Sequence, residues 1–193
     1  MFELLQQKIS EKIQLTEEEF AYCKTVFLPK KLRKRQYLLQ EGDVCKYQAF
    51  VVKGILRSYT IDEKGTEHIL QFAPEGWWIA DLYSYLTSEP SNFTIDALED
   101  AELLMIARPE WEELMKKVPK LEHYFRVLIQ NHLIATQRRL LQTITQTAEE
   151  KYRKFAQTYP DCIQRVPQHM IASYLGITRE TLSRLRKQMA VRK

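Results

Sequence analysis

Hydrophobic positions change their spacing along the chain, and these changes predict the order of helices and strands. In residues 1–27 the apolar side chains recur every three or four positions, at Phe2, Leu5, Ile9 and Ile13. Thr16, followed three residues later by Glu19, has the pattern of a capping box and predicts the start of a second helix. The N-terminal segment is therefore predicted to form one or two helices that pack by their apolar sides.

From Pro29 onward the pattern changes to short segments rich in β-forming residues. Four of the five glycines lie 11 to 12 residues apart, at Gly42, Gly54, Gly65 and Gly76. Turns at this spacing with short strands between them predict an antiparallel sandwich or barrel. The predicted strands are Gln36–Gln40, Gln48–Val52, Ile55–Ile61, Glu67–Phe72, Asn92–Ala97 and Ala101–Ile106. Residues 62–65 are expected to form a hairpin loop.

Helical spacing returns after Arg108. Pro109 opens a short predicted helix, and a longer one of about 28 residues begins near Pro119. The apolar stripe of the longer helix consists of Phe125, Ile129, Leu133, Thr136, Leu140 and Ile144, widened by Leu121, Leu128 and Leu141. Such a helix can lie on the strand-rich part of the chain or pair with a second copy of itself. Another predicted helix, Ala148–Tyr159, leads into the C-terminal segment.

The C-terminal segment Val166–Lys187 has the pattern of two short helices around a tight turn. Pro167 suits the first turn of one helix, Gly176 suits its left-handed end, and Thr178 can cap the next helix. Leu182, Leu185 and Met189 share one side of the second helix. The opposite side carries Arg179, Glu180, Ser183, Arg184 and Lys187. This layout is typical of a DNA-binding helix-turn-helix, although a surface hairpin with a solvated charged face is the alternative.

The charge of the chain is concentrated near this segment. The net charge is +4. Residues 148–193 contain 10 Lys or Arg and 4 Asp or Glu, so that they carry +6 and the rest of the chain −2. A basic balance beside a helix-turn-helix favours contact with phosphates, although basic tails also occur for solubility alone.

The run from Thr178 to Arg184, TRETLSR, resembles the recognition helix of the Crp/Fnr (catabolite activator) family of bacterial transcription regulators. In that family an Arg-Glu-x-x-x-Arg core reads bases. The resemblance therefore implies that Arg179, Glu180 and Arg184 read bases, with Ser183 beside them. Arg can bond guanine O6 and N7, and Glu can accept from cytosine N4.

Other segments resemble the β-roll of the cyclic-nucleotide-binding type that forms the sensor half of these regulators. They are Glu41–Asp43, Phe50–Arg57 and Ala73–Gly76, and their order and spacing carry the resemblance. Together with the helix-turn-helix, the resemblance covers nearly the whole chain from about Pro29.

This resemblance implies an α+β fold with three parts. Residues 1–118 would form an N-terminal antiparallel β-roll of the double-stranded β-helix (jelly-roll) type with flanking helices. Residues 119–147 would form a long dimerisation helix, and residues 148–193 a helix-turn-helix domain. The stretch between the break at Pro160 and Val166 is shorter than the β-hairpin wing of many family members, so the wing is predicted to be reduced or absent.

The same resemblance implies a homodimer on double-stranded DNA, with a near-palindromic operator and RNA polymerase as a further partner. The dimer contacts are predicted at Phe125, Leu128, Ile129, His132, Leu133, Thr136 and Leu140. The phosphate contacts are predicted at Gln168, Thr178, Arg186 and Lys187.

The segment that binds the ligand in this family is the part of the sequence that differs most from the family pattern. Cyclic-nucleotide binders use a Gly-Glu pair for the ribose and an Arg-Ser or Arg-Thr pair for the phosphate, but no arginine lies between Arg57 and Arg108 here. A buried phosphate without a cation is costly, so we expect no cyclic nucleotide, and the effector stays open. The residues at this position could line a pocket for an uncharged or cationic effector or fill a core: Gly76, Trp77, Trp78, Asp81, Tyr83, Tyr85, Asn92 and Thr94.

Motifs for catalysis, metal binding and membrane insertion are missing from the sequence. There is no Gly-x-Ser-x-Gly, Walker A or Gly-x-Gly-x-x-Gly motif, no histidine pair at ligand spacing and no Cys-x-x-Cys for the iron–sulfur cluster of other family members. Cys23, Cys45 and Cys162 are expected to be reduced thiols, with redox activity at Cys23 or Cys45 as the alternative.

With no membrane-length apolar run and no signal peptide, we expect a cytoplasmic protein that is not an enzyme and has no membrane partner. The alternative function is a cytoplasmic sensor or protein-interaction module of the same fold that does not read DNA.

Overall fold

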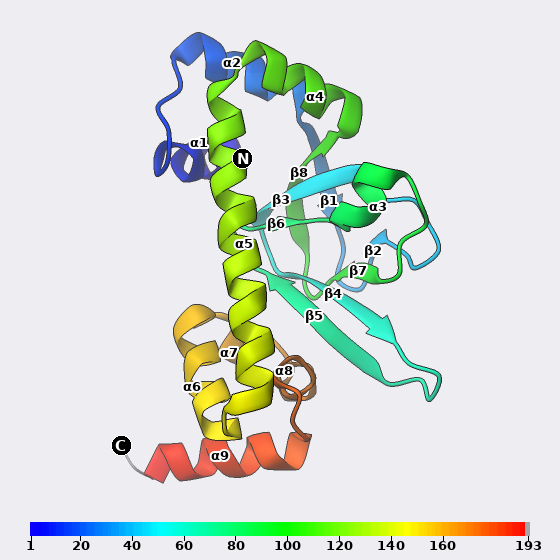
Figure 1. The fold of residues 1–193 in the computed structure, drawn as a ribbon, viewed down its shortest axis with the longest axis vertical. Coiled ribbons are helices and arrows are strands. Elements are labelled where there is room, and N and C mark those ends of the chain that lie inside the picture. Colours follow the sequence, from blue (N-terminus) through cyan, green and yellow to red (C-terminus); the bar gives the residue numbers. More distant parts are fainter. Residues whose placement is uncertain (192–193) are drawn as a thin grey trace. The chain divides into compact units, whose positions relative to one another are not determined.

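The computed structural model describes residues 1–191 of the chain (Figure 1). Arg192 and Lys193, two of the basic residues counted above, lie outside the described residues. The chain divides into two compact units. The first is Met1–Thr60 with Gln71–Ile129, and the second is Ile61–Leu70 with Gln130–Lys193. The division therefore falls inside the longest helix and inside a β-hairpin, whereas the sequence placed boundaries at the ends of that helix.

Two helices at the N-terminus begin the first unit: α1 (Phe2–Ser10) and α2 (Glu17–Val26). The capping box predicted before α2 is present. The Glu19 N–H donates to Thr16 Oγ1 at 3.2 Å, and the Thr16 N–H donates to Glu19 Oε2 at 2.7 Å. These reciprocal bonds satisfy two backbone donors that the first turn of a helix leaves unpaired.

Two four-stranded sheets form the roll, with the strand orders β1-β8-β3-β6 and β2-β7-β4-β5. Every strand pair whose register is described is antiparallel. The strands are β1 (Leu28–Leu32), β2 (Tyr37–Leu39), β3 (Tyr47–Lys53), β4 (Leu56–Ile61), β5 (Glu67–Ala73), β6 (Trp78–Ile79), β7 (Thr94–Ala97) and β8 (Ala101–Ala107). All six predicted strands are present, with ends that differ by at most two residues.

Two strands and two short helices were not predicted from the sequence: β1, β6, α3 (Leu82–Thr87) and α7 (Cys162–Arg165). Strand β1 reads LPKKL and is exposed except at Leu32, so it has no alternation of buried and exposed positions. Strand β6 contains only two residues. Their pairing partners, β8 and β3, hold them in the sheet, and pairing over such distances leaves no local pattern in the sequence.

Strand β8 is buried on both faces of the β1-β8-β3-β6 sheet. In β8, Leu103 and Met105 point into the interior of the roll, where they meet side chains of both sheets. The alternate residues Leu104 and Ile106 pack instead against helices on the outer face. Because side chains alternate across a strand, this two-sided burial explains the unbroken apolar run from Leu103 to Ala107 in β8.

The helices on that outer face are α1, α2, α4 (Arg108–Lys117) and the first part of α5 (Lys120–Thr145). Their shared core contains Leu5, Phe20, Leu114, Leu121 and Tyr124. The default packing role predicted for the N-terminal helices is confirmed by the burial of Leu5, Ile9 and Phe20.

The second unit contains the rest of α5 and four more helices within the described residues (Figure 1). They are α6 (Ala148–Thr158), α7 (Cys162–Arg165), α8 (Gln168–Leu175) and α9 (Arg179–Val191). Helices α6, α8 and α9 pack on one another. Residues 159–167, which connect α6 to α8, form the single turn α7 and no strand, so no β-hairpin wing occurs there. Among the described residues, no helix has both the length and the apolar character required to cross a membrane.

Candidate nucleic-acid interface

The turn between α8 and α9 has the geometry that the sequence predicted. Gly176 has a φ of +65°, in the left-handed region where glycine is favoured. The Ile177 N–H donates to the Ala172 carbonyl at 3.0 Å, and the Gly176 N–H to the Ser173 carbonyl at 3.1 Å. These bonds satisfy two of the last four carbonyls of α8 and fix the direction in which α9 begins.

The caps of the two helices agree with the prediction in one case and differ in the other. The Thr181 N–H donates to Thr178 Oγ1 at 3.2 Å, so Thr178 caps α9 as predicted. Pro167 lies one position before the first turn of α8, at the cap itself, where its ψ of 138° is extended. Its carbonyl accepts the Met170 N–H at 3.0 Å and the Ile171 N–H at 3.2 Å, so the proline begins α8 as its cap, one position before the predicted first turn.

Helix α9 presents one buried side and one exposed side. Leu182 is fully buried, and Leu185 and Met189 are partly buried. The small residue Ala172 is buried in α8, together with Ile171 and Leu175. The first helix of the motif therefore holds the second by an apolar contact, as the spacing predicted.

The exposed side of α9 carries the predicted base-reading residues. Arg179, Glu180 and Arg184 are exposed, and Ser183 is half-buried. The backbone N–H of Glu180 and the Thr178 hydroxyl, with Arg179 and Arg184 nearby, hold the pKa of Glu180 below its usual value. The side chain is therefore ionised at neutral pH and can only accept hydrogen bonds, as recognition of cytosine N4 requires.

The residues predicted to contact phosphate lie at the ends and on the outer side of the two helices. Gln168 and Thr178 are exposed at the N-terminal ends of α8 and α9. Backbone N–H groups at such ends favour an anion. Lys187 is exposed and Arg186 is half-buried, both in the second half of α9. The structure thus brings the predicted DNA-contacting residues together on one motif.

The predicted dimer residues fall into two groups along α5. Phe125 is 7% exposed and Leu128 is half-buried, and both pack into the helix-covered core of the first unit. They are therefore turned toward their own chain. Exposed apolar side chains continue beyond them at Ile129, Leu133, Ile134, Leu140, Leu141 and Ile144, and His132 and Thr136 are exposed among them.

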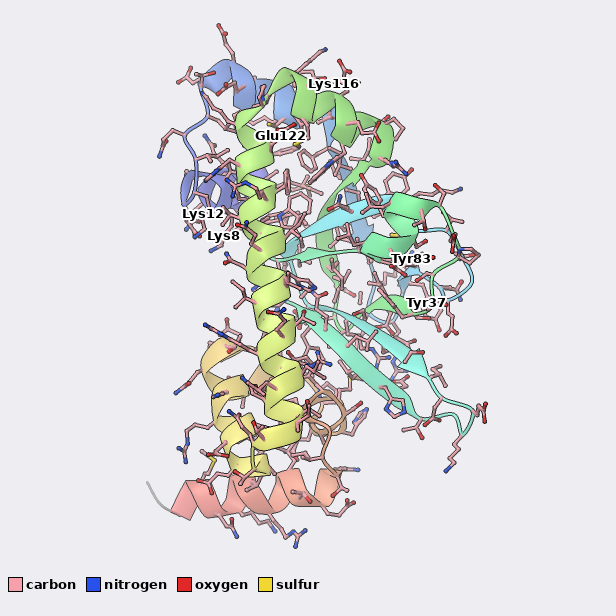
Figure 2. All side chains as sticks on the ribbon, viewed as in Figure 1. Lys8, Lys12, Tyr37, Tyr83, Lys116 and Glu122 are labelled. Atoms are coloured by element: carbon pink, nitrogen blue, oxygen red, sulfur yellow. The ribbon has the colours of Figure 1, made fainter. Side chains whose placement is uncertain are left out.

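The residues predicted for an effector pocket lie in different surroundings in the structure. The Trp78 ring lies in the outer core against Phe50 and Phe125, with ring centroids 5.4 and 5.3 Å apart. Tyr85 belongs to the separate core inside the roll. Trp77, Tyr83 and Asn92 are exposed, and Tyr83 lies at the surface on α3 (Figure 2).

The polar residues of that set bond to nearby parts of the chain. Asp81 accepts the Ser84 N–H at 3.1 Å, which caps α3, and accepts the Ser91 hydroxyl at 2.7 Å. Thr94 Oγ1 accepts the Glu41 N–H at 3.2 Å. Gly76 has a φ of +82° and turns the chain into β6. The polar groups of Asp81 and Thr94 therefore stabilise the segment between β6 and β7 by hydrogen bonds within the chain.

A separate cleft of about 570 Å³ lies in the roll, beside the loop before β3. It is lined by Leu38, Leu39, Gly42, Asp43, Val44, Cys45, Lys46, Tyr47 and Ile95. None of these belongs to the effector set predicted from the sequence. Eight of these nine residues lie within residues 38–47, and Ile95 of β7, which pairs with Leu39, completes the lining.

The three cysteines are buried and form no disulfide. Burial raises the pKa of the Cys23 thiol to about 11 and also raises that of Cys45. Both are therefore protonated at neutral pH and poor nucleophiles, which supports inert thiols over redox-active ones. No cluster of three or more metal-binding side chains occurs in the described part of the chain.

Known proteins resemble the chain in both sequence and fold. The cyclic nucleotide-binding domain family matches residues 29–118. The regulatory protein HlyX of Actinobacillus pleuropneumoniae is 30% identical over 186 residues, which cover 89% of this chain and 75% of HlyX. The fumarate and nitrate reduction regulatory protein of Vibrio cholerae serotype O1 is 28% identical over 169 residues, covering 81% of this chain and 66% of that protein.

The structure of FixK2 from Bradyrhizobium japonicum has the same fold, with a TM-score of 0.73 at 20% identity over 86% of both chains. The β-roll, the long helix and the C-terminal helix-turn-helix occur here in the order that the sequence predicted. On these grounds, the chain belongs to the Crp/Fnr family of bacterial transcription regulators.

Proposed function

We propose that this protein regulates transcription by binding, as a homodimer, to a near-palindromic site on double-stranded DNA. The observation that carries the proposal is the exposed side of α9, where Arg179, Glu180 and Arg184 project from a complete helix-turn-helix in a chain of this family. Because such a protein acts on the chromosome, we propose a location in the bacterial cytoplasm.

In this proposal the residues of the motif have separate roles. Arg179, Glu180 and Arg184 bond to base edges in the major groove, with Ser183 beside them. Gln168, Thr178, Arg186 and Lys187 bond to phosphates, which positions the motif without reading sequence. Because residues 159–167 form no hairpin, phosphate contacts from a wing are not part of the proposal.

The exposed stripe on α5 supports the homodimer. Leu133 is 56% exposed and Leu140 is 64% exposed, although both are large apolar residues. With Ile129 and Thr136 they recur at steps of four, three and four residues, the spacing of a coiled-coil seam. A second copy of the same helix has the matching surface. Since Phe125 packs into its own core, we place the seam from Ile129 onward.

RNA polymerase is the further partner that we propose, because a regulator bound at an operator acts on transcription through that enzyme. The measurement is a gel shift of the protein–operator complex with purified bacterial RNA polymerase. A slower complex that requires both the protein and the operator is expected. Its absence at every operator position near a promoter contradicts the partnership.

The residues at the family's ligand position do not fit a cyclic nucleotide. Ser91 lies in this loop with its hydroxyl bonded to Asp81, and no arginine lies between Arg57 and Arg108 to neutralise a phosphate. Arg57 itself is bound by both oxygens of Asp96. We propose that cyclic nucleotides are not effectors. Adding cAMP or cGMP should leave the melting temperature unchanged, and a rise in it contradicts this part of the proposal.

The test of the main proposal is selection of bound duplexes from a random library with the purified protein, at near-physiological salt. A consensus with two-fold symmetry and half-sites about one helical turn apart is expected. The affinity for that consensus should fall steeply as salt rises, because bound phosphates release counterions.

An absence of enrichment has two distinct explanations that a second selection separates. If the selection with added metabolite extract from bacteria enriches a consensus, an effector is required. If it again enriches nothing, the helix-turn-helix does not read DNA, and the protein-interaction module becomes the better description.

A further inference from the structure

A side chain of helix α8 forms hydrogen bonds to the β4–β5 hairpin, and the residues involved belong to the second compact unit. The Ser173 hydroxyl donates to the Glu67 carbonyl at 2.8 Å. The same oxygen accepts the Ile69 N–H at 3.0 Å. One side chain of the helix-turn-helix thus bonds to two backbone groups of β5.

The neighbouring residue Tyr174 connects α8 to α5 through a cation–π contact with Arg139. The guanidinium of Arg139 lies 4.4 Å from the centroid of the Tyr174 ring. Arg139 also donates to the Leu70 carbonyl of the hairpin. We refer to Arg139, Ser173, Tyr174 and the backbone of residues 67–70 as the α8 junction.

The chemistry of the junction suits a fixed attachment. Strand β5 ends its sheet, so its outer edge offers N–H and C=O groups that no further strand pairs. Ser173 satisfies one group of each kind from a half-buried position. The planar guanidinium of Arg139 stacks on an aromatic ring, which fixes its orientation better than a lysine would.

The orientation of α8 determines the orientation of the recognition helix α9, because the two helices are packed together. Ile171, Ala172 and Leu175 of α8 are buried, as is Leu182 of α9, and the Gly176 turn is closed by two backbone bonds. The two helices therefore move as one body. The angle of α9 relative to the C-terminal half of α5 then depends on the junction.

We propose that the α8 junction sets the half-site spacing that the dimer accepts, so that Ser173 and Arg139 are positioning residues for DNA recognition. This inference rests on the proposed homodimer. If two copies pair along α5, the separation of their recognition helices depends on how each helix-turn-helix is held on its own α5. One added base pair moves a half-site by about 3.4 Å and turns it by about 35° around the duplex. A helix-turn-helix held firmly on α5 should bind poorly when the half-site spacing changes by one base pair. A loosely held one should keep more of its affinity.

The experiment compares the affinities for the selected operator and for versions whose half-sites are one base pair closer or farther apart. The spacing ratio is the affinity for the selected spacing divided by that for the altered spacing. The variants are Ser173→Ala, which removes both bonds to β5, and Arg139→Lys, which keeps the charge but loses the planar contact. Each should lower the spacing ratio about threefold to tenfold, because Ser173→Ala loses two hydrogen bonds of ordinary strength and Arg139→Lys loses the stacking of the guanidinium on the Tyr174 ring.

Two control variants separate positioning from other effects. In Ser10→Ala the lost hydroxyl bond, to the Gln7 carbonyl at 2.8 Å, lies in α1, and the ratio should stay unchanged. Arg184→Ala should reduce discrimination between bases and leave the spacing ratio as it is. Hydrogen exchange of the Ile69 amide, measured without DNA, should accelerate in Ser173→Ala if the bond exists in solution.

Each result decides the matter in one direction. Lower spacing ratios with faster Ile69 exchange support the junction. Folded variants that keep the wild-type ratio overturn it, as does an Ile69 amide that exchanges no faster. If Ser173→Ala fails to fold by circular dichroism, Arg139→Lys carries the test. If the wild-type protein binds no duplex at all, the proposed function is wrong, and the proposed role of the junction fails with it.

Discussion

Arg57 and Arg184 show how position decides what an arginine can do in this chain. The Arg57 Nε and Nη2 donate to the two carboxylate oxygens of Asp96 at 2.8 and 3.0 Å, and both side chains are buried. Its guanidinium also lies 4.0 Å from the centroid of the Tyr59 ring. Arg184 is exposed on α9. The first arginine therefore stabilises the roll, and the second is available to DNA.

Replacing a base-reading arginine is expected to weaken specific binding. Arg184→Ala or Arg179→Ala should cost about 1–3 kcal/mol at the cognate site, because a forked donor to guanine is lost. Specificity should relax at one base pair of each half-site. Competition binding with operators substituted at each position measures both effects. Equal weakening on cognate and random DNA is incompatible with base reading.

Breaking the buried ion pair is expected to destabilise the roll strongly. Asp96→Asn leaves the buried Arg57 without its carboxylate, which should lower the free energy of unfolding by about 3–5 kcal/mol. Urea unfolding followed by tryptophan fluorescence measures this, because Trp77, Trp78 and Trp111 all lie in the first unit.

The control is an exposed pair in the same unit. Lys31 and Glu102 pair across β1 and β8 at 3.2 Å, and the Lys31 side chain is largely exposed. Glu102→Gln should change the free energy of unfolding by less than about 1 kcal/mol. Equal losses in Asp96→Asn and Glu102→Gln contradict the importance of burial.

At the scale of the elements, the glycines in two turns differ in the space available for a side chain. Gly54, between β3 and β4, has a φ of +90°, and a Cβ there would lie 2.8 Å from the Asp100 carbonyl oxygen and 2.9 Å from the Ala101 Cβ. Gly42, in the loop before β3, has a φ of +91° and nothing within 4 Å of such a Cβ. Both positions require a left-handed backbone, but only Gly54 also lacks space.

This pair of glycines gives a matched prediction. Gly42→Ala should lower the free energy of unfolding by about 1 kcal/mol, from the backbone conformation alone. Gly54→Ala should lower it by about 2–4 kcal/mol, since neighbouring backbone must also move. Urea unfolding of both variants tests the difference. Similar losses contradict a steric role for the Asp100 and Ala101 contacts.

At the scale of the whole molecule, the proposed function requires two copies of the chain. A single helix-turn-helix reads one half-site, and pairing along α5 makes the second contact intramolecular. The apolar stripe from Ile129 to Ile144 is long enough for several turns of such pairing.

A charge within this stripe is expected to separate the copies. Leu133→Asp should convert the dimer to a monomer in analytical ultracentrifugation. The affinity for the full operator should then fall by about 100-fold or more. Asn131→Asp, exposed on the opposite side of the same helix, is the control and should stay dimeric. A Leu133→Asp protein that remains a dimer shows that the seam lies elsewhere.

Much of this fold could be predicted from the sequence because its signals are local. The capping box at Thr16, the left-handed Gly176 and the cap at Thr178 each depend on a few neighbouring residues, and the structure has all three. The two sides of α9 follow from helical spacing alone. The exposed residues of the candidate interface could be named for that reason, whereas their contacts with DNA remain a prediction.

The sequence by itself determined the order of most elements, the polarity of the recognition helix and the missing phosphate-binding arginine, since composition and spacing record these directly. Only the tertiary structure decided which apolar residues face a core and which face outward. It buried Phe125, left Leu133 exposed, and dispersed Trp78, Tyr83 and Tyr85 among separate surroundings. It also brought Ser173 to the edge of β5, more than a hundred residues away in the chain. Such contacts depend on how distant elements pack, and no local pattern of residues encodes them.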